Sequence, residues 1–171
     1  MIVLVDLAEI QAAYYMVAAT GVLIAAVFYV LNMRATLQTR QAQLFMPIYA
    51  TFHEKEYQRG YYEVMNWQWS DFEDYQKKYS YQNNSEAAMY RSILGAHLEG
   101  IGVLLRRRLI DPSFVDDLMS QVIVRYWEKF GPLIRESRVK LNYPFMGEQS
   151  EYLYNQIKPI MEKQLRELTT V

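Results

Sequence analysis

The two histidines are the side chains best suited to acid–base or metal chemistry, and His97 has Glu99 two positions away. A histidine that shares a pocket with a carboxylate can act as a general base or hold a metal ion. Residues i and i+2 of a helix point in different directions, so this spacing does not bring the two groups together. We expect His97 to lie buried on an apolar helix face, hydrogen-bonded to a neighbouring carboxylate or carbonyl, and His53 to lie on a solvated face.

The rest of the sequence contains little that supports catalysis or cofactor binding. The chain has no cysteine, which excludes disulfides, thiolate zinc sites, iron–sulfur clusters and cysteine nucleophiles. It has no phosphate-binding glycine loop and no nucleophile at a recognisable spacing from a histidine. We therefore expect no catalytic residue, no metal and no cofactor. A membrane-tethered enzyme or sensor with a site near His97 and Glu99 stays open as the alternative.

Three glycines, Gly95, Gly100 and Gly102, flank His97 in a segment that is predicted to be helical. A dinucleotide-binding motif needs a strand before its glycines, and no strand pattern precedes these. Glycine destabilises a helix unless close packing compensates. We expect the three glycines to allow the close approach of another helix.

Arg106, Arg107 and Arg108 form the strongest cluster of charge. They end a predicted helix, where cations interact favourably with the negative end of the helix dipole. The alternative is contact with anionic lipid headgroups, for which Arg34 is a further candidate. Each basic side chain near such a surface contributes about 1 kcal/mol, so the cluster would orient a tethered domain rather than recruit it.

Aromatic side chains are concentrated between residues 57 and 81. In the simplest interpretation they form the edge of the core, with tyrosine hydroxyls that reach water. Tyr61, Tyr62, Trp67 and Trp69 are also candidates for contact with a partner protein or with the membrane interface. Acidic residues in the same segment disfavour stacking on a nucleic acid, and so does the net charge of −1.

The elements that carry these residues begin with an apolar segment. Residues 10–33 contain no charged side chain. As a helix they would span about 36 Å, enough to cross a hydrocarbon core of about 30 Å. Inside the segment, Ala18, Gly21 and Ala25 share one face, which allows a second helix to approach closely. We expect packing there in a homodimer or against another membrane subunit.

Charges on either side of the apolar segment predict its orientation. Asp6 and Glu9 precede it, whereas Arg34 and Arg40 follow it. Lys and Arg stay on the cytoplasmic side of a membrane, so we expect a single-pass protein of the cell inner (plasma) membrane. The parts are an extracytoplasmic N-terminus over residues 1–9, a transmembrane helix over residues 10–33 and a cytoplasmic helical domain over residues 34–171. A cleavable signal peptide is the competing interpretation, but it would need a basic n-region.

The part after the apolar segment is predicted to contain helices only. Its periodicity indicates an all-α fold, a cytoplasmic bundle of about four to six helices behind one transmembrane helix. Ser70 begins a capping-box pattern, and Asp111 precedes a proline at the start of another helix. Pro47 should kink or restart its helix, and Gly131–Pro132 should end another.

The last predicted helix runs from about Glu148 to Leu168. Its apolar residues recur at helical spacing, so we expect Leu165 and Leu168 to face inward along with the residues before them.

Three stretches of the second half resemble a known family. They are residues 97–115, residues 126–135 and residues 151–153. Their order and spacing resemble those of a group of prokaryotic proteins catalogued only as a domain of unknown function, over about residues 10 to 155. The resemblance implies an N-terminal membrane helix and a helical cytoplasmic domain. It implies no reaction and no catalytic residue.

These observations predict a non-enzymatic, membrane-anchored interaction protein. We expect an accessory or scaffold subunit of a membrane complex, whose partners are the lipid bilayer and other membrane subunits or a second copy of itself. We expect no nucleic-acid partner.

Overall fold

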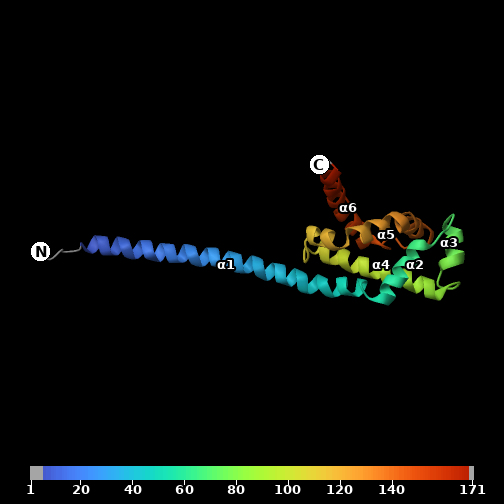
Figure 1. The fold of residues 1–171 in the computed structure, drawn as a ribbon, viewed down its shortest axis with the longest axis horizontal. Coiled ribbons are helices and arrows are strands. Elements are labelled where there is room, and N and C mark those ends of the chain that lie inside the picture. The colour runs from blue at the N-terminus through green and yellow to red at the C-terminus, as the bar shows by residue number, and fades with distance from the viewer. Residues whose placement is uncertain (1–5, 170–171) are drawn as a thin grey trace. The chain divides into compact units, whose positions relative to one another are not determined.

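The computed structural model describes residues 6–169 and contains only helices in that range (Figure 1). The helices are α1 (Leu7–Phe52), α2 (Lys55–Asn66), α3 (Phe72–Tyr79), α4 (Ser85–Arg106), α5 (Pro112–Lys140) and α6 (Glu148–Thr169). The predicted all-α fold, with one long apolar helix and a helical bundle, is therefore confirmed. Of the predicted N-terminal segment 1–9, residues 1–5 lie outside the described range.

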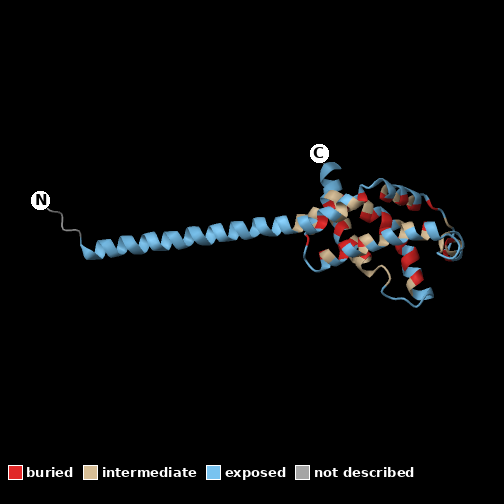
Figure 2. Cartoon of the chain, turned by 90° about the horizontal axis from the view of Figure 1, so that it is seen from below, coloured by how far each residue is buried: buried red, intermediate tan, exposed pale blue. Residues whose placement is uncertain are grey.

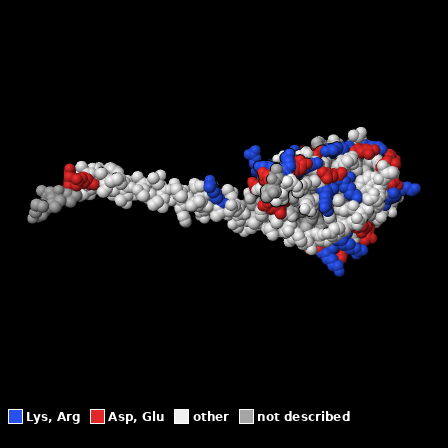
Figure 3. Space-filling view, turned by 45° about the horizontal axis from the view of Figure 1, so that its top comes forward, with Lys and Arg blue, Asp and Glu red and all other residues white. Residues whose placement is uncertain are grey.

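The chain divides into two compact units, one ending at Ala42 and the other beginning at Gln43. In the first unit, the described part of α1 is exposed along nearly its whole length. Figure 3 shows that much of the surface of α1 carries no charged side chain, and that acidic side chains lie near its N-terminal end. α1 is long and apolar enough to cross a membrane, a property that it shares with N-terminal signal sequences.

The second unit has one hydrophobic core of buried residues (Figure 2). The helix that contributes more of these residues than any other is α5. Val115, Met119, Tyr126 and Phe130 recur at helical spacing along α5 and are buried, while Leu118 and Val122 are half-buried. α6 packs against both α4 and α5, and α2 packs against α4. On the face of this unit drawn in Figure 3, basic and acidic side chains are interspersed.

Prolines inside helices do not interrupt them. The predicted break at Gly131–Pro132 is wrong, because α5 continues to Lys140, and α1 does not restart at Pro47. Pro47, Pro132 and Pro159 are all exposed, so each ring faces solvent, where helix hydrogen bonds lengthen most easily. A proline there removes one backbone hydrogen bond, and burial of neighbours such as Phe130 holds the helix together.

Side-chain caps fix several helix starts. Asp111 caps α5 by accepting a hydrogen bond from the Ser113 backbone N–H at 2.9 Å, as predicted. α3 starts one residue later than the predicted box implies. Its cap is Asp71, whose carboxylate accepts from the Asp74 N–H at 2.8 Å, and the Ser70 N–H donates to Asp74 instead.

The end of α6 extends beyond the helices that cover its first half (Figure 1). The expectation that Leu165 and Leu168 face inward is wrong, since they are 52% and 77% exposed. Leu153 and Ile157, earlier on the same helix, are fully buried. Periodicity identifies an apolar face, but burial also requires a neighbouring element to cover it.

Candidate functional site

His97 borders a cavity of about 250 Å³ between α4, α2 and the end of α1. Its ring lies 5.9 Å from the ring of Phe52 and 5.0 Å from that of Tyr57, measured between centroids. The expected hydrogen bond to a carboxylate or carbonyl is not formed at Nδ1, which is buried and has no partner among the described residues. Burial lowers the pKa of His97 because it disfavours the charged ring.

Tyr57 is the second polar group at this cavity. Its side chain is buried, and its hydroxyl has no hydrogen-bond partner in the described part of the chain. Burial raises the pKa of Tyr57, and the neighbouring Tyr126 raises it further. Two polar groups without partners thus lie beside one largely apolar cavity. His53, by contrast, is exposed as predicted.

Glu99 faces a different neighbour. Its carboxylate accepts hydrogen bonds from the backbone N–H and the hydroxyl of Ser150, each at 2.7 Å. Ser150 lies in the first turn of α6, so a side chain of α4 caps the N-terminus of α6. Glu99 lines a cavity of about 260 Å³ that His97 does not border. The structure therefore does not bring His97 and Glu99 into one acid–base site.

The three glycines of α4 have different surroundings. A Cβ added at Gly102 would collide with the backbone of Gln149 on α6, so close helix packing is confirmed there. A Cβ at Gly95 would lie 3.3 Å from the Tyr126 hydroxyl. At Gly100 it would meet nothing within 4 Å, so the packing explanation is wrong for that residue.

The three arginines at the end of α4 have different surroundings. Arg106 forms an ion pair with Glu148 at 2.7 Å and donates to Gln149 at 3.1 Å, which ties α4 to the start of α6. Arg107 and Arg108 follow the last residue of α4 and are exposed. Arg34 is exposed on α1. Lipid contact by these arginines stays a prediction.

The four aromatic residues proposed as partner contacts lie at different depths. Trp67 is buried and stacks on Tyr79, with ring centroids 4.2 Å apart. Trp69 is half-buried and stacks on Phe130. Tyr61 is half-buried, and Tyr62 is 62% exposed. Tyr62 is therefore the member of this set that presents most of its ring to a partner.

Lys129 is a residue that the sequence does not single out. It donates to the carbonyls of Met65 and Trp67 at 2.6 and 2.7 Å, so a cation of α5 caps the C-terminus of α2. Burial lowers the pKa of Lys129. No local pattern could reveal this contact, because more than sixty residues separate the partners along the chain.

Comparison with known protein families identifies a match over most of the chain. Residues 15–157 match the family described as Domain of unknown function (DUF4760). The chain belongs to this family. The predicted membership in a family of unknown function is therefore confirmed. No curated protein and no solved structure matches the chain. The DUF4760 match includes most of the apolar segment and ends at Ile157, before the exposed turns of α6.

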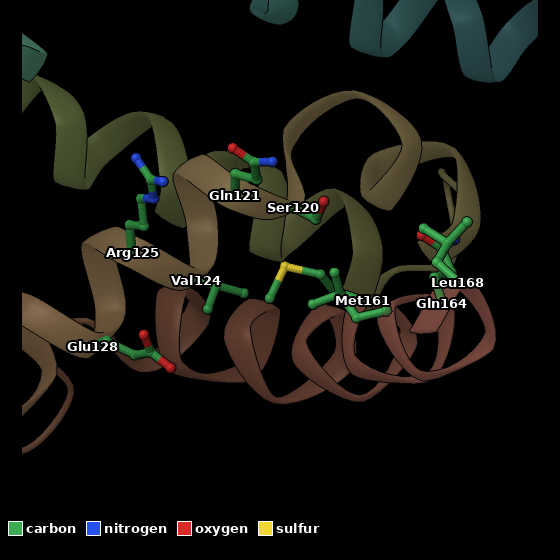
Figure 4. Close-up of a pocket in the computed structure, with 9 residues that line it drawn as sticks. Ser120, Gln121, Val124, Arg125, Glu128, Met161, Gln164 and Leu168 are labelled. Atoms are coloured by element: carbon green, nitrogen blue, oxygen red, sulfur yellow. The ribbon is translucent and has the colours of Figure 1, made fainter. Parts of the chain in front are cut away.

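Beyond the DUF4760 match, the exposed end of α6 forms one wall of a groove with α5 (Figure 4). The groove has a volume of about 380 Å³. Val124, Met161 and Leu168 contribute apolar surface, while Arg125 and Glu128 stand along α5 (Figure 4). The sequence alone does not reveal this groove, because the helical spacing of the leucines of α6 predicts that they face the core.

Proposed function

We propose that this DUF4760 protein is a single-pass protein of the inner (plasma) membrane that works by binding another protein, without catalysis. Its N-terminus lies outside and residues 34–171 lie in the cytoplasm. It acts as an accessory or scaffold subunit, and its partner is another membrane subunit or a second copy of itself. No nucleic acid is involved.

The charge pattern of α1 supports the membrane placement. Residues 10–33 carry no charge, and their side chains are all exposed, so this long apolar surface is of the kind that a membrane would cover. Asp6 and Glu9 on one side and Arg34 and Arg40 on the other favour an orientation with the C-terminal unit in the cytoplasm.

Apolar surface without a neighbour is the observation that carries the interaction proposal. On α6, Leu165 and Leu168 expose most of their surface beside a groove that has both apolar and polar lining residues. On α1, a Cβ at Gly21 would meet nothing within 4 Å, so the face it shares with Ala18 and Ala25 is open to a second helix. A helix packed there and a partner in the groove would each bury apolar surface.

Crosslinking and native mass spectrometry in mild detergent test this proposal. We expect a complex that Leu165→Glu disrupts, because the substitution replaces exposed apolar surface on α6 with a charged side chain. Leu141→Glu is the matched control, since Leu141 is similarly exposed, at 53%, and lies at the end of α5. A strictly monomeric chain without partners in its native membrane would contradict the proposal.

The orientation has its own test, which the lack of cysteine makes simple. A single cysteine is introduced either by Glu9→Cys or by Lys163→Cys, and intact cells are treated with a membrane-impermeant thiol reagent. We expect labelling of the first variant only. Labelling of the second variant alone would reverse the orientation.

A second candidate function is a membrane-tethered enzyme or sensor that uses the cavity beside His97. The observation that favours it is the pair of buried polar atoms, His97 Nδ1 and the Tyr57 hydroxyl, which have no partner among the described residues. Titratable groups with shifted pKa values beside a cavity are typical of functional sites. A cellular activity that His97→Gln abolishes and Glu99→Gln leaves intact would favour this candidate over the scaffold.

A further inference from the structure

The cavity that Glu99 lines has a polar floor. It lies between α4, α5 and the start of α6 and has a volume of about 260 Å³. Tyr126 of α5 is only 2% exposed, and its hydroxyl hydrogen-bonds to no residue that the structure describes. This hydroxyl lies 3.3 Å from the position that a Cβ of residue 95 would take. Because residue 95 is glycine, the floor of the cavity stays uncovered.

Arg91 lies at the rim of the same cavity, one helical turn before Gly95. Its guanidinium lies 5.7 Å from the centroid of the Tyr75 ring and 5.8 Å from that of Phe130. Within residues 6–169, Arg91 has neither an ion pair nor a hydrogen bond, and its Nε is buried. The two rings hold the guanidinium in place, so little entropy would be lost when a ligand binds its N–H groups.

Of the two charged side chains that line the cavity, Arg91 and Glu99, only Arg91 has no hydrogen-bond or ion-pair partner among the described residues. Glu99 is the carboxylate in its lining, and Ser150 already donates two hydrogen bonds to it. Burial raises the pKa of Tyr126, the positive charge of Arg91 opposes this rise and the negative charge of Glu99 adds to it, so both charges act on the Tyr126 hydroxyl. Ile134 and Met146 add apolar lining that suits the body of an organic molecule.

We propose that this cavity binds a small organic carboxylate. The carboxylate pairs with the Arg91 guanidinium in the charge-assisted geometry that arginine favours, and the Tyr126 hydroxyl hydrogen-bonds to the ligand. The apolar body of the ligand contacts Ile134 and Met146. This site is separate from the groove between α5 and α6, so it does not depend on binding of a partner protein.

Calorimetric titration of the full chain in detergent micelles tests the site, with benzoate as the probe. Its neutral counterpart benzamide has the same shape without the charge, and inorganic phosphate has the charge without the apolar body. We expect benzoate to bind and benzamide and phosphate to bind at least about tenfold more weakly. Phosphate binding as tight as benzoate would overturn the assignment of an organic ligand.

Two variants locate the bound probe. Arg91→Met should weaken benzoate binding about tenfold or more, because it removes a charged hydrogen-bond donor. Gly95→Ala should also weaken it, because the added methyl group covers the Tyr126 hydroxyl. Arg91 borders a second cavity of about 390 Å³ beside Tyr75 and Tyr79, which the methyl group would not reach. If Arg91→Met weakens benzoate binding and Gly95→Ala does not, the proposed location of the site is overturned.

Arg107→Met is the matched control, because Arg107 is an exposed arginine at the end of the same helix. It should bind benzoate as the natural protein does. Circular dichroism verifies that each variant keeps its helices, and Gly95→Ala keeps the test decisive if Arg91→Met does not fold. Benzoate that fails to bind the natural protein, or that binds all variants equally, would overturn the proposal.

Discussion

The backbone of Gln149 lies directly against Gly102, so that a Cβ on residue 102 would approach the Gln149 carbonyl carbon to 2.7 Å. This approach brings the first turn of α6 onto α4. Two side-chain contacts secure the same place, from Glu99 to Ser150 and from Arg106 to Glu148. The close packing of α4 and α6 therefore depends on Gly102, which has no side chain.

Gly102→Ala should destabilise the second unit by about 1–3 kcal/mol, because α6 must move to admit the methyl group. Gly100→Ala is the matched control, two residues away with nothing within 4 Å. That change should instead stabilise the helix by about 0.5–1 kcal/mol. Thermal unfolding followed by circular dichroism compares the two. Equal effects of the two substitutions would contradict the close approach at Gly102.

Lys129→Met should destabilise the fold by about 1.5–3 kcal/mol, because two carbonyls at the end of α2 lose a charged donor while the aliphatic stem stays. Lys77→Met, at an exposed lysine of α3, serves as the control and should change stability by less than about 0.5 kcal/mol. Hydrogen exchange adds local information, since amides of α2 should lose protection first. Unchanged exchange in α2 would count against the cap.

Arg108→Gly should stabilise the protein by about 1 kcal/mol. Arg108 has a φ of 56°, and it ends α4 in a Schellman motif, with the Leu109 N–H donating to Leu104 at 2.9 Å. Glycine adopts this conformation without strain. Arg107→Gly is the comparison, because Arg107 has a right-handed φ of −78° and should gain nothing. The melting temperatures of the two variants test this prediction: only Arg108→Gly should melt at a higher temperature than the natural protein.

Stability should fall as pH decreases through the titration of His97. Burial lowers the pKa of His97 below its ordinary value of 6.5, so the unfolded chain binds a proton more tightly than the folded one. The contribution of His97 is therefore complete above pH 6.5 and is lost as pH falls toward the folded pKa. His97→Gln and His97→Phe should both lose the pH-dependent part of the stability, because neither new side chain titrates. The two replacements differ in polarity and shape, so a loss common to both reflects the missing charge and not altered packing. Unfolding measured between pH 7.5 and about 4.5 tests it; identical pH profiles for the natural protein and both variants would refute it.

Local signals in the sequence place the starts of some helices. Asp111 before Pro112 marks the start of α5, and Asn84 caps α4 by accepting from the Ala87 N–H at 3.1 Å. These caps join residues two or three positions apart, so sequence alone reveals them. Pro132 misleads because its local cost is real, but burial on the opposite face of α5 outweighs it.

The candidate sites were much harder to predict. The spacing of His97 and Glu99 does indicate that they face different neighbours, and the structure agrees. Nothing local indicates that Arg91 has no ion pair with any described residue or that Lys129 caps α2. Such facts depend on which residues of distant segments lie nearby, and a single sequence does not encode them as a short pattern.

The sequence by itself determined the all-α class, the uncharged segment at residues 10–33 and the exclusion of cysteine chemistry. Each depends on composition or on a helical repeat, which short-range geometry converts directly into structure. Only the tertiary structure decided that α6 packs closely against Gly102, that the Tyr126 hydroxyl lines a cavity beside Arg91 and that the end of α6 is exposed. These properties arise from contacts between segments far apart in the chain, where a neighbour's presence or absence determines what a side chain does.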